Sequence, residues 1–242
     1  MLDVVLPVYN EVGDLPATVR RLHDYLEQFP WTWRITVADN ASTDGSWEEA
    51  RQLASLLPKV RAVHLDAKGR GRALRSAWST SDAAVLCYMD LDLSTNLEAV
   101  SALVTPLIEG RADITIGSRL VRGSRVMRSV KRELLSRIYN RLLQMVFRNR
   151  FKDAQCGFKA LRSEVARRLL SDVRNNTWFF DTELLLLAER NGMRITEIPV
   201  DWVEDSDSRV AILPTALGDL AGIARMALRF WTGHGRLDLD HP

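Results

Sequence analysis

The chain has 242 residues, of which 46% are hydrophobic and 26% are charged. This is the composition of a globular protein that can bury a sizeable core, and it excludes disorder over most of the length. No stretch reaches about 18 uncharged apolar residues, so no segment is expected to cross a bilayer. The two cysteines, Cys87 and Cys156, define no disulfide framework, which favours a reducing compartment.

The formal net charge of +2 hides a strongly basic block. Residues 111–174 contain 17 Lys and Arg residues against 5 Asp and Glu residues, a net charge of +12. The remainder of the chain is therefore acidic. A basic block of this size favours an anionic partner, such as phosphates, nucleic acid or a lipid surface.

From the N-terminus onward, the first half of the chain alternates strand and helix patterns. The first helix is expected after Asp14, which is placed to cap it. Apolar runs predict five buried strands, at residues 3–8, 33–39, 60–65, 83–90 and 112–117. Such β-α repeats predict an α/β fold with a mostly parallel, doubly wound sheet and right-handed crossovers.

A long basic segment follows at residues 119–150. Apolar residues at steps of four predict an amphipathic helix, with the stripe Val130, Leu134, Ile138, Leu142 and Val146. The stripe either packs on the sheet or rests on a membrane surface.

The remaining segments complete the expected fold. Residues 154–161 form a strand or turn, 163–171 a short helix, and 193–203 a strand suited to a sheet edge. Residues 211–231 include Asp219, Arg225 and Arg229, so they predict an amphipathic helix and not a span. We expect one domain at residues 1–210 and a C-terminal amphipathic helix and tail at 211–242 that associates with a membrane.

Two carboxylates follow the fourth strand in the stretch "YMDLDLSTN" (residues 88–96). Ligands of doubly wound sheets bind beyond the carboxyl ends of the strands, and Asp90 and Asp92 point to one side of an extended strand end. Two such carboxylates suit Mg²⁺ or Mn²⁺, which takes its other oxygen ligands from water and phosphates. The alternative is an Asx turn, with Ser94 and Thr95 capping the next helix.

Neighbouring strand ends carry further polar residues. In "KGRG" (residues 68–71), Lys68 and Arg70 accompany glycines at a helix start and can meet anionic oxygens. Asp39, at the end of the second strand, can accept hydrogen bonds from a nucleobase N–H or from ribose hydroxyls. Alternatively, it caps the following turn.

Seven short motifs occur in order along residues 2–210: "LPVYNE", "ADNASTDGS", "KGRG", "DLDLS", "GSR", "QCGFK" and "ITEIPV". In this order they resemble family 2 glycosyltransferases of the GT-A fold. The similarity is greatest to the branch that makes polyprenyl-phosphate sugars, the dolichyl-phosphate mannose and glucose synthase type.

The resemblance implies a donor site and an acceptor site. Residues implied to contact the nucleotide are Pro7, Tyr9, Glu11, Asp39 (on the base), Lys68, Asp90 and Leu91. Asp90 and Asp92 would bind the diphosphate through Mg²⁺ or Mn²⁺. Arg119 and Arg132 would receive the acceptor phosphate. Ser208 and Arg209 would close over the diphosphate, with Arg209 standing where relatives have Lys.

The implied reaction is metal-dependent, inverting transfer of a hexose from a nucleotide sugar to polyprenyl phosphate. "DLDLSTN" looks more like the glucose-using relatives, which favours UDP-glucose over GDP-mannose as the donor. An acceptor phosphate is already anionic at neutral pH, so no strong base is needed. This fits Asn40, which stands where many relatives carry a second Asp.

Alternatives from other classes remain at this point. A family 2 enzyme could act on a saccharide or small hydroxylated acceptor, or the chain could be a nucleotide-binding module without turnover. Nucleic acid is not an expected partner, because acids at four of the five strand ends would repel a phosphate backbone. The expected location is cytoplasmic, peripheral at the cytoplasmic face of an anionic membrane surface.

Overall fold

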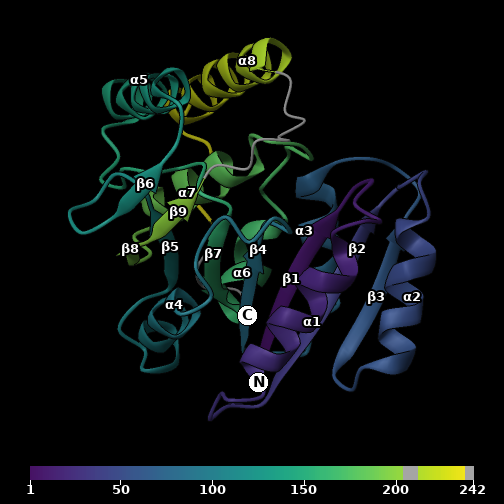
Figure 1. Ribbon diagram of the computed structural model, residues 1–242. Helices are drawn as coiled ribbons and strands as arrows, with labels where there is room; N and C mark the ends of the chain where they lie inside the picture. Colours follow the sequence, from purple (N-terminus) through teal and green to yellow (C-terminus); the bar gives the residue numbers. More distant parts are fainter. Residues whose placement is uncertain (204–211, 238–242) are drawn as a thin grey trace.

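A seven-stranded sheet forms the centre of the protein (Figure 1). The structure is a computed structural model, and it describes residues 1–203 and 212–237. The strand order is β3-β2-β1-β4-β7-β5-β8, and a separate two-stranded sheet pairs β6 with β9. All neighbours in the large sheet are parallel except β7, which runs antiparallel to β4 and to β5. The mostly parallel α/β architecture predicted from the sequence is confirmed.

The elements follow the predicted order with two differences: β6 was not predicted, and residues 193–203, expected as one strand, form β8 in the large sheet and β9 in the small one. The strands are β1 (Leu2–Val8), β2 (Trp33–Asn40), β3 (Val60–Leu65), β4 (Val85–Met89), β5 (Ile114–Ser118), β6 (Arg125–Met127), β7 (Phe158–Arg162), β8 (Ile195–Pro199) and β9 (Asp201–Val203). The helices are α1 (Leu15–Leu26), α2 (Ser46–Leu56), α3 (Arg70–Ser79), α4 (Ala99–Ile108), α5 (Val130–Phe147), α6 (Ser163–Leu170), α7 (Phe180–Arg190) and α8 (Ile212–Trp231).

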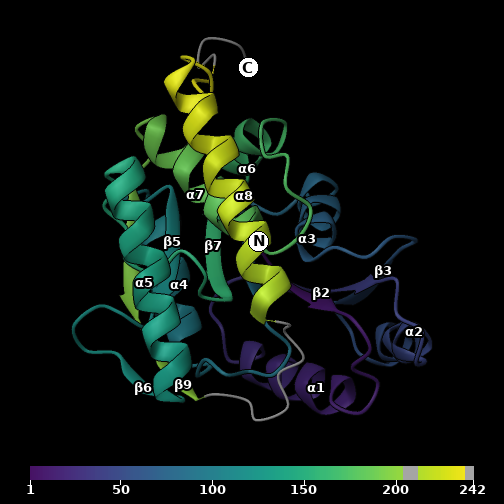
Figure 2. The same ribbon diagram turned by 90° about the horizontal axis from the view of Figure 1, so that it is seen from above.

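The sheet is covered on both faces, which is what the continuous apolar strands require. In β1, Leu2, Val4, Leu6 and Val8 join the core formed with α1, α2 and α4. Val5 joins a second core with α3, α6 and α7. Figure 2 shows the two helical layers on opposite sides of the strands. The sheet is therefore doubly wound, as predicted.

The predicted cap of the first helix is wrong. Asp14 occupies the N-cap position, but its side chain makes no capping hydrogen bond. Its backbone is already helical, with φ −94° and ψ −24°, and the N–H groups of Asp14 and Leu15 both donate to the carbonyl of Glu11. The chain thus already turns at Glu11 and gives Asp14 a helical backbone, and the second helical residue, Pro16, has no N–H for a side-chain cap to bind.

The antiparallel strand β7 brings the "QCGFK" segment beside the "DLDLS" segment. Met89 pairs with Phe158, and one residue farther the N–H of Asp90 donates to the carbonyl of Gly157 at 3.0 Å. Of residues 154–161, expected as strand or turn, 154–157 include a turn and 158–161 belong to a strand in the middle of the sheet. β8 lies at the sheet edge, as expected for this segment.

Helices α5 and α8 lie side by side at the end of the molecule toward which β1 runs (Figures 1 and 2). Along the predicted stripe of α5, Val130, Leu134, Ile138 and Val146 are exposed, and only Asn140 and Leu143 of this helix are buried. Leu142 is the one residue of the stripe that packs against the second core, so the alternative that this stripe packs on the sheet is wrong for the other four. Within residues 1–203 and 212–237, no helix combines the length and apolarity that crossing a bilayer requires.

Candidate active site

Asp90 and Asp92 line one small cavity beyond the end of β4. Its volume is about 10 Å³, and Ser94, Gly157 and Trp202 contribute to its walls. A volume of this order holds a single water or ion. The Asx turn considered as the alternative is also present, because the N–H of Ser94 donates to Oδ1 of Asp92 at 2.9 Å. The turn fixes Asp92 at the rim of the cavity, so the two interpretations coexist.

Gly157 gives Asp90 its position. A Cβ atom on residue 157 would lie 1.7 Å from Oδ2 of Asp90, so only glycine leaves room for the carboxylate. Gly117 lies near the same segment, where a Cβ would meet Phe158 at 2.9 Å. The residue just before β7 therefore meets the Asp90 carboxylate with backbone atoms and no side chain.

A buried network of charges lies beneath Asp90. Arg70 ion-pairs with Asp90 at 3.3 Å and with the fully buried Asp181. Lys159, 1% exposed, donates to Asp181 at 3.0 Å, and the Tyr88 hydroxyl also donates to Asp181. Burial alone would raise the pKa of Asp181, but Arg70 and Lys159 hold the pKa below its ordinary value. Asp181 therefore remains ionised as the anchor of two cations.

The pKa of Asp90 shifts in the opposite direction from that of Asp181. Burial raises the pKa of the Asp90 carboxyl, Asp92 raises it further, and Arg70 only partly offsets these effects. A group in this situation gains from another cation, because a nearby positive charge favours the ionised form. Its side chain is still 42% exposed, so the cavity is open to a ligand.

The end of β2 carries a buried acceptor. Asp39 is fully buried and contacts Nδ1 of His64 through Oδ2 at 2.7 Å. Its Oδ1 is buried and has no hydrogen-bond partner among the described residues. Next to it, Oδ1 of Asn40 accepts the N–H of Gly69 at 2.7 Å. Asn40 thus holds the "KGRG" loop, and Asp39 presents an unused acceptor.

The loop after β1 lies against the loop after β2. The N–H of Asn10 donates to Ser42 at 3.0 Å, and the N–H of Glu11 donates to Ser46 at 2.9 Å. On the same side, the ammonium group of Lys68 lies 3.5 Å from the ring centre of Tyr9. Of the other predicted nucleotide residues, Pro7 is half-buried in β1 and Leu91 is buried.

The two arginines predicted for the acceptor occupy different settings. Arg119 binds the fully buried Asp153 through Nε at 2.8 Å and Nη2 at 2.9 Å, and its guanidinium lies 5.3 Å from the ring centre of Trp202. Trp202 also lines the cavity of Asp90 and Asp92. Arg132 lies half-buried in the first turn of α5. Ser208 and Arg209 lie outside the described residues.

Sequence reasoning missed the residues that complete these contacts: Asp153, Lys159, Asp181 and His64 as the partner of Asp39. Lys159 belongs to the "QCGFK" motif, and Asp181 is an acid at the start of the apolar run "FFDTELLLL". Those were usable signals, because an acid in a buried helix needs a partner. Asp153 had no comparable signal.

The donor set fits a hard divalent ion that keeps other ligands. Among residues 1–203 and 212–237, no cluster of three or more His, Cys, Asp or Glu side chains is placed to hold a metal. Two carboxylates around a cavity of about 10 Å³ match the way Mg²⁺ and Mn²⁺ are bound with substrate phosphates, where the protein supplies only one or two ligands.

Asp219 on α8 is a further carboxyl near this region. Nε2 of Gln155 donates to it at 2.7 Å, and the side chain is buried. Burial raises the pKa of Asp219 to about 6, only partly opposed by the Gln155 hydrogen bond and by Arg70.

Comparisons with known proteins agree with this arrangement. Residues 3–170 match the family described as glycosyl transferase family 2. The chain is 36% identical over 233 residues to glycosyltransferase AglD of Haloferax volcanii, over 95% of this chain and 37% of AglD. It is 30% identical over 252 residues to human dolichyl-phosphate beta-glucosyltransferase, over 98% of this chain and 78% of that protein. The chain thus spans little more than a third of AglD.

A solved structure confirms the predicted GT-A fold. Glucosyl-3-phosphoglycerate synthase from Mycobacterium tuberculosis, in complex with Mn²⁺, UDP-glucose and phosphoglyceric acid, is similar with a TM-score of 0.70. The match covers 94% of this chain and 79% of that chain, at 18% sequence identity.

The raised pKa of Asp219 makes stability depend on pH. Its folded pKa of about 6 lies above the ordinary 3.8, so the folded state prefers the protonated carboxyl. The cost of ionising it is absent below the ordinary pKa and is fully present above the folded pKa. At about pH 7.5, Asp219→Asn should raise the free energy of unfolding by about 1 to 3 kcal/mol. The gain should shrink as the pH falls toward about 4.

Urea denaturation at several pH values measures this difference. Asp24→Asn, which changes an exposed acid on α1, is the matched control and should show no such trend. A gain for Asp219→Asn that does not vary with pH would mean that Asp219 ionises normally.

Proposed function

Since this chain belongs to glycosyl transferase family 2, we propose that it transfers a hexose, glucose in preference to mannose, from a nucleotide sugar to a polyprenyl phosphate. The observation that carries the proposal is the pair Asp90 and Asp92 around one small cavity at the carboxyl end of the sheet. The relative named dolichyl-phosphate beta-glucosyltransferase supports the choice of sugar and acceptor, and UDP-glucose bound to a structural neighbour supports the choice of donor.

Asp90 and Asp92 would hold Mg²⁺ or Mn²⁺ against the donor diphosphate. The ion supplies charge neutralisation to the diphosphate as it leaves. Arg70, already bound to Asp90 and Asp181, adds a fixed positive charge at the same place. Because Asp181, which Lys159 also binds, fixes this arginine in place, its charge needs no rearrangement during the reaction.

The residues after β1, β2 and β3 would bind the nucleotide. The unused Oδ1 of Asp39 can accept an N–H of the base, which would satisfy a buried acceptor. The Tyr9 ring and the Lys68 ammonium group form one contact surface, suited to a base or ribose on one side and a phosphate on the other. Pro7, Glu11 and Leu91 would complete this pocket, and Ser208 and Arg209 would close it.

The acceptor phosphate would be held by Arg119 and Arg132. Asp153 fixes the Arg119 guanidinium by two hydrogen bonds and orients it beside the Asp90 cavity. An oxygen of the acceptor phosphate attacks C1 of the sugar while the bond from C1 to the diphosphate oxygen breaks. The bonding electrons leave with the nucleoside diphosphate, and the configuration at C1 inverts. The attacking oxygen is already anionic near neutral pH, so no residue has to remove a proton.

A hydroxyl acceptor is the second candidate, and one observation favours it. Such an acceptor needs a base, and Asp219, with a pKa of about 6, is a carboxyl suited to that task. Transfer from UDP-glucose to a small hydroxylated acceptor without any lipid phosphate would select this candidate.

A polyprenyl acceptor requires contact with a membrane, and α5 and α8 offer it. In α8, the exposed apolar residues Leu213, Leu217, Leu220, Leu228 and Trp231 are spaced by three, four or eight residues, so they lie on one face of the helix and form one stripe. Helix α5, which carries the other exposed stripe, lies beside α8 (Figure 1), and its residues Lys131, Arg137 and Arg141 are exposed. We propose that both helices rest on an anionic membrane surface, with the protein peripheral at the cytoplasmic face.

Asp92→Asn tests the metal assignment. The amide keeps the oxygen that accepts the Ser94 N–H, so the loop is retained while the negative charge is lost. Glucose transfer from UDP-glucose to polyprenyl phosphate with Mn²⁺ should fall by about a hundredfold or more. Product is measured by chromatography of the lipid phase, with GDP-mannose as the alternative donor.

The matched control is Asp66→Asn, which changes a fully exposed acid before the "KGRG" loop. Turnover of Asp92→Asn within a few-fold of this control would contradict the assignment. Absence of transfer by the wild-type protein with either donor would contradict the proposed function.

Gly157→Ala tests the position of Asp90. The added methyl group would take the space of the Asp90 carboxylate and displace it, so Mn²⁺-dependent donor binding should weaken by about a hundredfold. Binding is measured by calorimetry with UDP. Gly218→Ala is the control, since a Cβ there meets nothing within 4 Å. Unchanged Mn²⁺ dependence in the folded variant would mean that Asp90 does not hold the ion.

Leu217→Ser tests the membrane surface. Leu217 is 60% exposed, so the change should leave the fold intact while it lowers partition to lipid vesicles by about tenfold. Flotation with vesicles measures it. Leu56→Ser on α2, 58% exposed, is the matched control and should partition like the wild type. Equal losses in both variants would mean that α8 does not face the membrane.

A further inference from the structure

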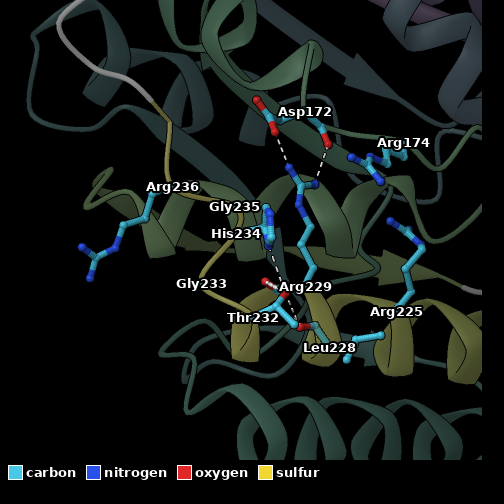
Figure 3. A pocket seen from close by; sticks show the side chains of 10 residues that line it. All are labelled: Asp172, Arg174, Arg225, Leu228, Arg229, Thr232, Gly233, His234, Gly235 and Arg236. Atoms are coloured by element: carbon cyan, nitrogen blue, oxygen red, sulfur yellow. Dashed lines mark hydrogen bonds and ion pairs between the residues drawn. The ribbon is translucent and has the colours of Figure 1, made fainter.

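A second, larger pocket lies where α8 ends (Figure 3). Its volume is about 660 Å³, and none of its lining residues belongs to the candidate active site. The walls are the segment between α6 and α7, the last turns of α8 and the chain that follows α8. Neither the sequence motifs nor the proposed reaction accounts for this pocket.

The chain after α8 forms one wall of the pocket and is held in place by hydrogen bonds. Gly233 and Gly235 have φ values of 82° and 87°, which let the chain turn back over α8. Asn191, just after α7, fixes the returning chain on both sides: its Nδ2 donates to the carbonyl of Gly235 at 2.9 Å, and its Oδ1 accepts the N–H of Leu237 at 2.7 Å.

Arginines dominate the lining. Arg174, Arg225, Arg229 and Arg236 line the pocket together with His234, and among the described lining residues the only acid is Asp172. Asp172 pairs with Arg229. Behind the wall, the fully buried Glu183 accepts two hydrogen bonds of 2.8 Å from Arg225 and lies 3.8 Å from Arg229.

Two of the four arginines are not neutralised in this way. In the part of the chain that the structure describes, the side chains of Arg174 and Arg236 make no hydrogen bond or ion pair. They come from different walls, Arg174 from the segment before α7 and Arg236 from the chain after α8 (Figure 3). Counted over residues 1–203 and 212–237, the pocket therefore carries a positive charge that its acids do not balance.

The surrounding charge adds to this excess. Arg190, beside the pocket, donates to the carbonyl of Phe230 at 3.2 Å. Burial lowers the pKa of Arg190, and the like charges of Arg236 and Arg229 lower it further. Like charges held together destabilise the fold unless an anion joins them.

The pocket also borders the apolar stripe of α8. Leu228 lines it and is 58% exposed, and Trp231, in the last turn of the helix, is 85% exposed. A ligand in the pocket would therefore contact both the arginine side chains that line it and apolar side chains at its rim. Arginine suits phosphate, because its planar fork donates two parallel hydrogen bonds.

We propose that this pocket binds a phosphate-bearing anion, separate from the donor and acceptor phosphates of the active site. The phosphate group can belong to a lipid headgroup, reached as α8 rests on the membrane, or to a soluble phosphate compound. The proposal does not depend on sugar transfer, because it is tested by binding alone.

The test compares the wild-type protein with the double variant Arg174→Gln/Arg236→Gln. Both side chains are exposed and unpaired, so the variant should fold normally. One arm measures co-sedimentation with vesicles of phosphatidylcholine, alone or mixed with phosphatidylglycerol. The other titrates glycerol phosphate by calorimetry without vesicles. Binding to the anionic vesicles should weaken by roughly fivefold for each arginine, with no change on neutral vesicles.

The matched control is Lys131→Gln/Arg141→Gln, which removes two exposed cations from α5 on the same end of the molecule. A loss larger than this control on anionic vesicles identifies a lipid headgroup. A loss confined to glycerol phosphate identifies a soluble phosphate compound as the ligand. The proposal is overturned if the pocket variant binds anionic vesicles as strongly as the control does and also binds glycerol phosphate as strongly as the wild type does.

Discussion

Charge balance beneath Asp90 is the constraint on which the site depends. A buried carboxylate is costly unless cations and hydrogen bonds compensate it, and here Asp90 and Asp181 share Arg70 while Lys159 secures Asp181. This leaves Asp90 only partly compensated, with its pKa raised. The network therefore holds the carboxylate in place and still leaves it able to gain from another cation. The same side chains therefore stabilise the fold and serve the proposed reaction.

The topology of the sheet supplies those side chains. Because β7 enters antiparallel between β4 and β5, its first residues lie beside the last residues of β4. It brings the Gly157 backbone against Asp90, and Lys159 points into the buried network one residue beyond Phe158. A parallel strand in that position would present its opposite end there. The short motif "QCGFK" thus has two functions, to leave space for one carboxylate and to anchor another.

Sequence patterns predicted the local elements better than the contacts between them. Runs such as residues 3–8 and 33–39 are buried on both faces of the sheet, so their apolar pattern and length were enough to identify them as strands. Periodicity carries no strand direction, so β7 could not be oriented, and the cap at Asp14 failed because a turn at Glu11 preceded it. Pairs such as Arg119 with Asp153 join residues far apart in sequence, and only the folded sheet brings them together. The Asp90 and Asp92 pair was visible because both acids directly follow the end of one buried strand.

The place of β7 in the sheet also bears on how the chain reaches this state. On a ribosome, β1 to β4 emerge early and can pair with one another, since each needs only neighbours already made. One edge of β4 must then wait until residues 158–162 have been synthesised, and β5 has no partner before β7 and β8 appear. Unpaired strand edges invite association with other chains. The nascent chain therefore exposes unpaired strand edges until β7 and β8 have been synthesised, and a chaperone that covers such edges would protect it during that interval.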